Sequence, residues 1–325
     1  MKYKIFFCKE GIFMRGRSYE YTTPKKPNLE DYEKVYAGFR WEDVENELGW
    51  ADAGKVNIAY SCVDRHVHSG RGEKVAIIYD DFLRREFYTY NDLFKLSNCF
   101  GNALKKIGIK KGDRVTLFLP RVPEFYISFL AIVKIGAIAI PLYEGYMHGA
   151  VQDILQDSEP TAIITTPSLR KRIDSERLPS LKTLIVVGNS QRSKAQTHAE
   201  TDWYTALAQG TDREAVEWVD RDEPMLLMYT SGSTGKPKGA LHVHEGALQY
   251  YQTGKWVLDL QEGDIYWCTA DPSWITGISY GIWAPLLNGT TSLIYGGEFK
   301  AEKWYTILEK YRVSIWYTTP TSLRR

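Results

Sequence analysis

The strongest chemical signal in the sequence is one short segment, Tyr229-Thr230-Ser231-Gly232-Ser233-Thr234-Gly235-Lys236-Pro237-Lys238-Gly239. Its three glycines permit backbone conformations that other residues avoid, so main-chain N–H groups can approach a phosphate closely. The hydroxyl side chains add hydrogen-bond donors, and the two lysines add positive charge. Charge-assisted hydrogen bonds of this kind contribute about 1.5–3 kcal/mol each, so a few are enough to hold a triphosphate. We therefore predict a phosphate-binding loop.

The spacing within this segment excludes the P-loop of kinases and GTPases. That motif needs four residues between its glycines and a lysine followed by serine or threonine. Here two residues separate Gly232 from Gly235, and Pro237 follows Lys236. A flexible surface linker is the alternative interpretation, because Gly, Ser and Thr are common in linkers. It leaves the lysines unexplained, and linkers seldom follow an apolar strand such as Met225–Tyr229 directly.

The string resembles the phosphate-binding loop of the AMP-forming adenylating enzymes, the superfamily of acyl-CoA synthetases, luciferases and nonribosomal peptide adenylation domains. The resemblance implies a two-step reaction. A carboxylate attacks the α-phosphate of ATP to give an acyl-adenylate and pyrophosphate, and the thiol of coenzyme A then displaces AMP. Mg²⁺ is expected because ATP brings it. The ATP- and pyrophosphate-binding residues would be Thr230, Ser231, Gly232, Ser233, Thr234, Gly235, Lys236, Lys238 and Gly239.

A second segment, Ala270–Gly277, resembles the acetyl-CoA synthetase branch of this superfamily. In that branch an Ala-Asp-x-x-Trp-x-Thr-Gly string forms part of a small acyl pocket, and the likeness extends from about Tyr32 to the end of the chain. The resemblance implies acetate as the acid. Propionate and other short acids are alternatives, because one methylene changes affinity by only about 1–3 kcal/mol. Taken alone, the tryptophan is better explained by core packing, whereas the whole string favours the acyl pocket. The acyl-pocket residues would be Trp274, Ile275, Thr276 and Gly277.

Weaker signals concern coenzyme A. Arginines after the equivalent strand of acetyl-CoA synthetases contact its 3′-phosphate, and by resemblance Arg170 and Arg172 would do so here, with Gly145 beside the coenzyme A channel and Thr276 near the thiol path. A solvated charge run is the competing interpretation. His242 and His244 alternate, so they would share one face of a strand. No third ligand is near them in the sequence, so we predict packing or hydrogen-bonding roles for the histidines and no metal site.

The elements that must position these residues follow from the alternation of short apolar runs with longer amphipathic ones. This rhythm predicts an α/β fold with two parallel-rich sheets covered by helices, as the resemblance to the large N-terminal domain of adenylate-forming enzymes also implies. The expected strands are 115–119, 137–142, 162–165, 183–187, 225–229, 265–269, 291–295 and 313–318. The expected helices are 91–107, 123–134, 149–156, 245–256, 277–287 and 301–311, and helical spacing also occurs within 31–48.

The domain organisation that we predict has an N-terminal extension at 1–60, a first α/β subdomain at 61–200 and a second at 201–325. The polar stretch 190–222 is expected to connect two sheet-based subdomains. Members of the resembled family continue well beyond this point, into a small C-terminal domain that carries the adenylation lysine. We therefore expect a truncated chain in which that domain and the catalytic residue are absent.

Three hypotheses follow from this expectation. The first is an incomplete acetate–CoA ligase, inactive by itself. The second is a non-catalytic nucleotide-binding fragment or one subunit of a split protein, with a second polypeptide supplying the remainder. The third is an adenylating enzyme that hands its acyl group to a carrier protein.

Composition excludes several other classes of protein. The chain has 325 residues, of which 44% are hydrophobic and 25% charged, and 41 basic against 40 acidic residues leave a net charge of +1. We therefore expect no nucleic-acid or membrane partner, since any anion must be bound locally. Four cysteines without CxxC spacing favour free thiols in a reducing cytoplasm. The apolar run 125–142 is interrupted by Lys134, Gly136 and Pro141, so we predict a buried helix and strand there.

Overall fold

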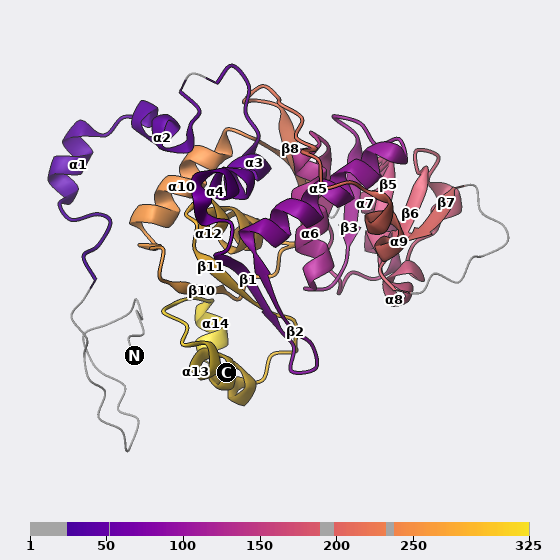
Figure 1. Ribbon diagram of the computed structural model, residues 1–325. Helices are drawn as coiled ribbons and strands as arrows, with labels where there is room; N and C mark the ends of the chain where they lie inside the picture. Colours follow the sequence, from indigo (N-terminus) through magenta and orange to yellow (C-terminus); the bar gives the residue numbers. More distant parts are fainter. Residues whose placement is uncertain (1–24, 52, 189–197, 232–236, 325) are drawn as a thin grey trace.

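The computed structural model describes residues 25–51, 53–188, 198–231 and 237–324, and two β-sheets lie at its centre (Figure 1). One sheet has the strand order β12-β10-β11-β1-β2, and the other has the order β7-β6-β5-β3-β4-β8-β9. Parallel pairing dominates both sheets. The antiparallel pairs are β1 with β2 and β8 with β9. The predicted fold class, two parallel-rich sheets with helices, is therefore confirmed.

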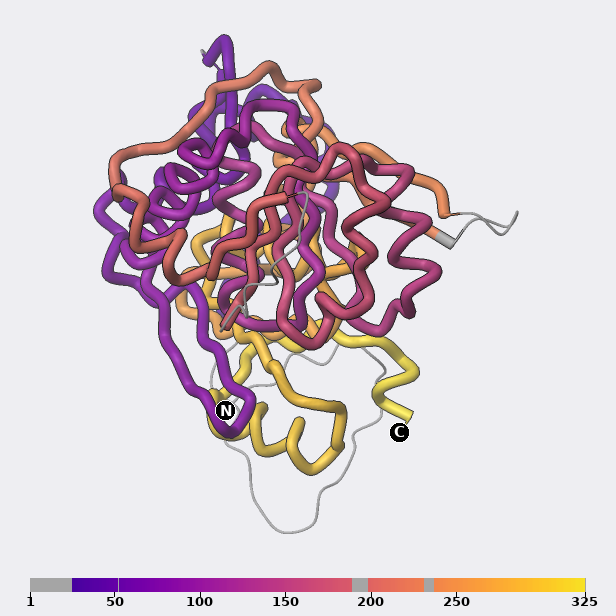
Figure 2. Tube along the Cα trace, turned by 90° about the vertical axis from the view of Figure 1, so that its right-hand side faces the viewer, coloured from indigo at the N-terminus to yellow at the C-terminus, as the bar shows by residue number. Residues whose placement is uncertain are grey.

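The five-stranded sheet combines the beginning and the end of the described chain. Its strands are β1 (Val75–Asp80), β2 (Arg85–Thr89), β10 (Ile265–Cys268), β11 (Thr291–Tyr295) and β12 (Ile315–Tyr317). Strand β1 pairs in parallel with β11, more than 200 residues later in the sequence. Figures 1 and 2 both show the β1–β2 hairpin beside the C-terminal part of the chain, where the Asp80 carboxylate binds Lys310 and Tyr311.

The seven-stranded sheet is built from the middle of the sequence. Its strands are β3 (Arg114–Phe118), β4 (Ile138–Pro141), β5 (Ala162–Thr165), β6 (Thr183–Val186), β7 (Ala199–Asp202), β8 (Pro224–Ser231) and β9 (Pro237–Val243). The strands from β3 to β8 run parallel, so their carboxyl ends lie at one edge of the sheet. In open sheets of this kind ligands bind at that edge.

The helices cover the sheets and connect successive strands. Helix α5 begins with a capping box between Thr89 and Asp92, and α6 begins with Pro123 and is buried along its whole length. The longer helices are α5 (Tyr90–Lys106), α6 (Pro123–Lys134), α7 (His148–Ser158), α10 (Gly246–Trp256) and α13 (Ala301–Tyr311), and the seven-residue helix α9 (Trp203–Gln209) contacts α5. No helix in the described ranges is long and apolar enough to cross a bilayer.

Shorter helices complete the fold. Figure 1 shows α1 and α2 at one side of the molecule, where α2 contacts α10. These elements are α1 (Tyr32–Gly38), α2 (Trp41–Leu48), α3 (Ile58–Cys62), α4 (Asp64–His66), α8 (Pro167–Arg170), α11 (Ile275–Ile278), α12 (Ala284–Leu287) and α14 (Pro320–Leu323), with π-helical turns η1 (Val67–Arg71) and η3 (Ser279–Trp283) and a 3₁₀ turn η2 (Ser175–Arg177).

Most expected elements are confirmed, and Pro123–Lys134 and Ala301–Tyr311 are right at both ends. Four strands were not predicted, namely β1, β2, β7 and β9. The helix expected at 277–287 is divided into α11, η3 and α12. The expectation that 190–222 separates two sheets is wrong. Strand β7 within that stretch belongs to the seven-stranded sheet, and β1 and β2 from the first part of the chain belong to the five-stranded sheet.

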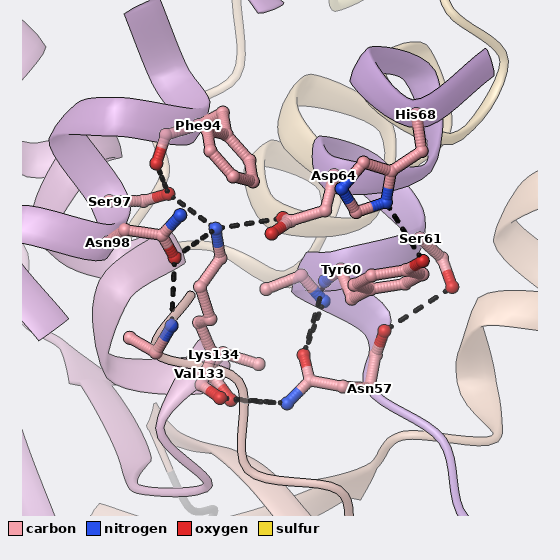
Figure 3. A network of polar contacts seen from close by, with 12 residues as sticks. Asn57, Tyr60, Ser61, Asp64, His68, Phe94, Ser97, Asn98, Val133 and Lys134 are labelled. Atoms are coloured by element: carbon pink, nitrogen blue, oxygen red, sulfur yellow. Dashed lines mark hydrogen bonds and ion pairs between the residues drawn. The ribbon is translucent and has the colours of Figure 1, made fainter. Parts of the chain in front are cut away.

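A buried polar network ties the segment before β1 to the rest of the fold (Figure 3). Lys134 Nζ lies 2.8 Å from Asp64 Oδ2, and both side chains are fully buried. The same ammonium group donates to Ser97 Oγ and Asn98 Oδ1. Burial raises the pKa of the Asp64 carboxyl and lowers that of Lys134, while their mutual attraction opposes both shifts. The network joins α4, α5 and α6, which explains the lysine inside an otherwise apolar helix.

Candidate functional site

The predicted phosphate-binding residues lie on the β8–β9 hairpin and the segment that it encloses. Thr230 pairs with Lys238, Tyr229 pairs with Gly239, and Ser231 pairs with Pro237. These positions were expected in a loop. They extend the two strands instead, because antiparallel pairing satisfies their backbone hydrogen bonds. The predicted residues Gly232, Ser233, Thr234, Gly235 and Lys236 lie outside the described residues.

The base of this hairpin is fixed by close packing. The Tyr229 hydroxyl donates to Asp157 Oδ2 of α7 at 2.6 Å, and the ring is buried. A Cβ atom at Gly239 would lie 2.8 Å from Leu227 Cδ1, so glycine leaves the space that this leucine fills. Thr230 and Lys238 are exposed on the hairpin. The exposed ammonium group of Lys238 is available to a bound anion.

The predicted acyl-pocket segment follows β10 and forms a tight turn into α11. Asp271 Oδ1 accepts hydrogen bonds from the backbone N–H and the hydroxyl of Ser273, and the Asp271 carbonyl accepts from Trp274 N. A Cβ atom at Gly277 would lie 2.0 Å from the Asp271 carbonyl oxygen. This turn therefore requires glycine at position 277, which accounts for the residue in structural terms.

Exposure distinguishes between the two interpretations of Trp274. Its side chain is 47% exposed and that of the adjacent Ile275 is 38% exposed, whereas Thr276 is half-buried and Gly277 buried. Trp274 therefore lies outside the core of the described residues. A bulky apolar side chain at the surface of a tight turn can instead form a wall of a small pocket.

Two of the four positions predicted for coenzyme A, Arg172 and Gly145, lie close together. Arg172 Nη1 donates to the backbone carbonyls of Glu144 and Tyr146, which flank Gly145. A Cβ atom at Gly145 would lie 2.4 Å from the ring of Tyr143, so glycine is required unless that ring moves. The Tyr143 ring in turn packs against Trp274, with 6.3 Å between ring centroids. The structure thus brings the loop Tyr143–Tyr146, called the Gly145 loop below, to the acyl-pocket segment.

Arg170 lies elsewhere. Its guanidinium donates to the Ile173 carbonyl and to Ser175 Oγ, and it lies 3.9 Å from the Glu200 carboxylate of β7. Lys171 between the two arginines is exposed. Arg172 is therefore closer than Arg170 to the other predicted site residues.

His244 has the hydrogen-bonding role that was predicted for it. His244 is fully buried, and its Nδ1 accepts a hydrogen bond from the backbone N–H of Ile58 at 3.1 Å. Burial and the positive charge of Lys111 lower the pKa of His244 to about 4, so the ring is neutral at pH 7. Within the described ranges of the chain, no group of three His, Cys, Asp or Glu side chains is placed to hold a metal ion.

One charged residue of this region was not predicted from the sequence. Arg121 follows β3, and its Nε lies 3.8 Å from Asp271 Oδ2. Its position directly after a parallel strand was the available signal, because the carboxyl ends of such strands form ligand sites. The edges of the two sheets therefore lie side by side here, with Arg121 after β3, Glu144 after β4 and Asp271 after β10. The hairpin strand β8 ends at the same edge, because it pairs in parallel with β4.

Comparisons with known proteins concern the family and the fold of the chain. A family model described as AMP-binding enzyme matches residues 63–325. The chain is 49% identical over 298 residues to an acetyl-coenzyme A synthetase of Bacillus subtilis (strain 168), covering 91% of this chain and 52% of that protein. It is 37% identical over 330 residues to an acetyl-coenzyme A synthetase of Pyrobaculum arsenaticum, covering 87% of this chain and 49% of that protein.

A solved structure gives the same result for the fold. The crystal structure of a Brucella canis acyl-CoA synthetase superimposes with a TM-score of 0.82 at 25% identity, over 90% of this chain and 53% of that one. The chain thus spans about half the length of the relatives that it matches.

Proposed function

The chain belongs to the AMP-binding enzyme family, and from this premise we propose that it forms the ATP-, acyl- and coenzyme A-binding part of an acetate–CoA ligase. The first half-reaction would join acetate to the α-phosphate of ATP and release pyrophosphate. In the second, the coenzyme A thiol would attack the acyl carbon and release AMP. The observation that carries the proposal is the meeting of the predicted acyl-pocket segment, the Gly145 loop and the β8–β9 hairpin at one edge of the fold.

The proposed roles of the residues follow from their positions. The hairpin residues Thr230 and Lys238, with the segment that they enclose, would bind the β- and γ-phosphates. Donors placed there stabilise the charge that develops on the leaving pyrophosphate. Mg²⁺ would arrive with ATP and neutralise part of the same charge, and the phosphates provide the oxygen ligands that it prefers.

The acid and the thiol would approach from the other side of the same edge. The exposed pair Trp274 and Ile275 would limit the length of the acyl group, with Thr276 and Gly277 forming the floor of the turn. Arg172 would support the Gly145 loop along which coenzyme A enters. The names of the relatives favour acetate.

The direct test is acetate-dependent ATP–pyrophosphate exchange, followed by acetyl-CoA formation when coenzyme A is added, measured on the protein as encoded. Lys238→Ala should lower the exchange rate by about 10- to 150-fold, which corresponds to the loss of one charge-assisted hydrogen bond of about 1.5–3 kcal/mol. Lys95→Ala is the matched control, because Lys95 is an exposed lysine on α5. ATP–pyrophosphate exchange at the parental rate in the Lys238 variant would exclude phosphate binding by Lys238. Exchange at an equal rate without any carboxylic acid would contradict the activation of acetate.

A further inference from the structure

Charged residues follow three strand ends beside the acyl-pocket segment. Arg121 follows β3, Glu144 follows β4, and Asp271 follows β10 of the other sheet. The Arg121–Asp271 pair spans the two sheets with 3.8 Å between Nε and Oδ2. The side chains of this pair are 23% and 21% exposed, so water screens the pair less than it screens an ordinary surface ion pair.

Glu144 adds a second carboxylate to this cluster of charges, and its pKa responds to both members of the ion pair. Burial raises the pKa of the Glu144 carboxyl, and the negative charge of Asp271 raises it further. The positive charges of Arg121 and Arg172 oppose this shift. Two neighbouring carboxylates repel each other unless a cation or a proton intervenes. Arg172 binds the backbone on either side of Gly145, so Arg121 is the cation that directly pairs with a carboxylate of this cluster.

The second oxygen of Asp271 organises the acyl-pocket turn. It accepts from the backbone N–H and the hydroxyl of Ser273, while the Asp271 carbonyl accepts from Trp274 N and is covered by Gly277. A displacement of Asp271 therefore moves the start of α11 and the side chains that it carries. The turn is closely packed at Gly277, where even a methyl group would clash with the Asp271 carbonyl.

We propose that Arg121 is a positioning residue of the acyl and thiol site. It pairs with Asp271, offsets the repulsion between the Asp271 and Glu144 carboxylates, and so fixes the segment Trp274–Gly277 against the Gly145 loop. The inference rests on the proposed function of this site. It adds a residue from the end of β3 to the predicted set, and it gives the two carboxylates a structural task rather than contact with substrate.

The test uses Arg121→Ala, Arg121→Lys and the double variant Arg121→Ala/Glu144→Gln in the protein as encoded. Arg121→Ala should lower kcat/KM for acetate in acetyl-CoA formation by about 10- to 100-fold, since displacements of about 1 Å have effects of that size. Arg121→Lys keeps the charge and should retain most activity. The double variant should recover several-fold over Arg121→Ala, because the neutral amide that replaces the Glu144 carboxylate no longer repels Asp271.

A pH profile separates positioning by charge from a general packing defect. Without Arg121, protonation of Glu144 is the remaining way to relieve the repulsion. The ratio of Arg121→Ala to parental kcat/KM should therefore rise as the pH is lowered toward the titration range of that carboxyl, whose pKa is already raised by burial. The groups that face this carboxyl are Asp271, Arg121 and Arg172. A pH-independent ratio, or a double variant no better than Arg121→Ala, would overturn the proposal.

Hydrogen–deuterium exchange provides a readout that does not depend on catalysis. In Arg121→Ala the peptide spanning 270–278 should exchange several-fold faster than in the parent, since Ser273 N and Trp274 N lose their fixed acceptors, and Arg121→Lys should leave it near parental protection. Unchanged protection in Arg121→Ala would overturn the positioning role even if the protein makes no acetyl-CoA. A parent without acetyl-CoA synthesis, but with the expected exchange pattern, would overturn the proposed function alone.

Discussion

Substitution of Gly277 by alanine should disable the proposed acyl pocket through one methyl group. The added Cβ would lie 2.0 Å from the Asp271 carbonyl oxygen, 2.4 Å from its carbon and 2.8 Å from Pro272 N. All three are backbone atoms, so no side-chain rotation relieves the clash. An ordinary contact begins at 3.4 Å, so the turn must open by more than an ångström at its tightest point.

Two opposing effects determine the stability of Gly277→Ala. Forcing an extra carbon into a closely packed site costs about 1–3 kcal/mol. Replacing glycine by alanine also restricts the unfolded chain, which stabilises the folded state by about 0.4–1 kcal/mol. The steric cost is larger, so we expect a net loss of about 1–2 kcal/mol and a Tm that is lower by a few degrees.

The effect on activity should exceed the effect on stability. A displacement of about 1 Å in groups that align substrate can reduce the rate by about 100-fold, equivalent to about 2.7 kcal/mol in the barrier. Acetate-dependent ATP–pyrophosphate exchange measures the loss, and thermal unfolding shows that the variant is folded at the assay temperature. Gly38→Ala is the matched control, because a Cβ atom at that position, at the end of α1, meets nothing within 4 Å.

The outcomes separate two parts of the reasoning. A lower Tm with parental exchange would mean that the turn is tight but does not form the acyl pocket. Parental Tm together with parental exchange would refute the close packing itself, and with it the argument that only glycine fits at position 277.

Three further predictions concern other parts of the molecule. Lys134→Met should lower the free energy of unfolding by about 3–5 kcal/mol, because Asp64 is left buried without its cation. The pKa of the Asp64 carboxyl is then higher in the folded than in the unfolded state. Urea unfolding should therefore show that the lost free energy of unfolding grows as the pH rises. Burial lowers the pKa of His66 to about 3 and that of His244 to about 4. Because the unfolded chain binds more protons below pH 6.5, the free energy of unfolding should be highest above that pH and should fall on acidification by about 1.4 kcal/mol per pH unit for each ring. In urea titrations from pH 7 to 5, His66→Gln should make the free energy of unfolding less dependent on pH. Butyrate should be activated with a kcat/KM about 5- to 150-fold below that of acetate, because two extra methylenes overpack a short pocket at about 1–3 kcal/mol; equal or better use of butyrate would contradict the proposed pocket size.

Local patterns were sufficient to predict the elements that contain the site. The strand before the phosphate-binding segment and the helix at Pro123–Lys134 follow from short apolar runs bounded by glycine and proline, and both are present. The lysine inside that helix was evidence against a membrane span. Its partner Asp64 lies far earlier in the sequence, on α4, and no local pattern connects the two. A buried ion pair forms only when packing brings the elements together, so its second member stayed unpredicted.

Sheet membership depends on contacts across the whole sequence. Val75–Asp80 is an apolar run that the local sequence pattern does not assign to a strand. Its partner β11 begins at Thr291. A division of the chain by position therefore assigns β1 to the same unit as β3, although the two strands lie in different sheets. Such pairing is set by the burial of both faces of each sheet, which periodicity within one segment does not specify.

The candidate site shows the same limit at the scale of side chains. Residue types and spacing are enough to predict a phosphate-binding segment and a role for Trp274, because those features are contained in a few consecutive residues. Arg121 carries no such pattern, and its importance appears only when the end of β3 faces the end of β10. A pocket formed at the junction of two sheets needs residues that hold the sheets in register. Their signal is a charge at the end of a strand and an opposite charge at the end of another strand in the other sheet. Consecutive-residue motifs therefore find the groups that would touch substrate, whereas the groups that would position them must be sought across the interface.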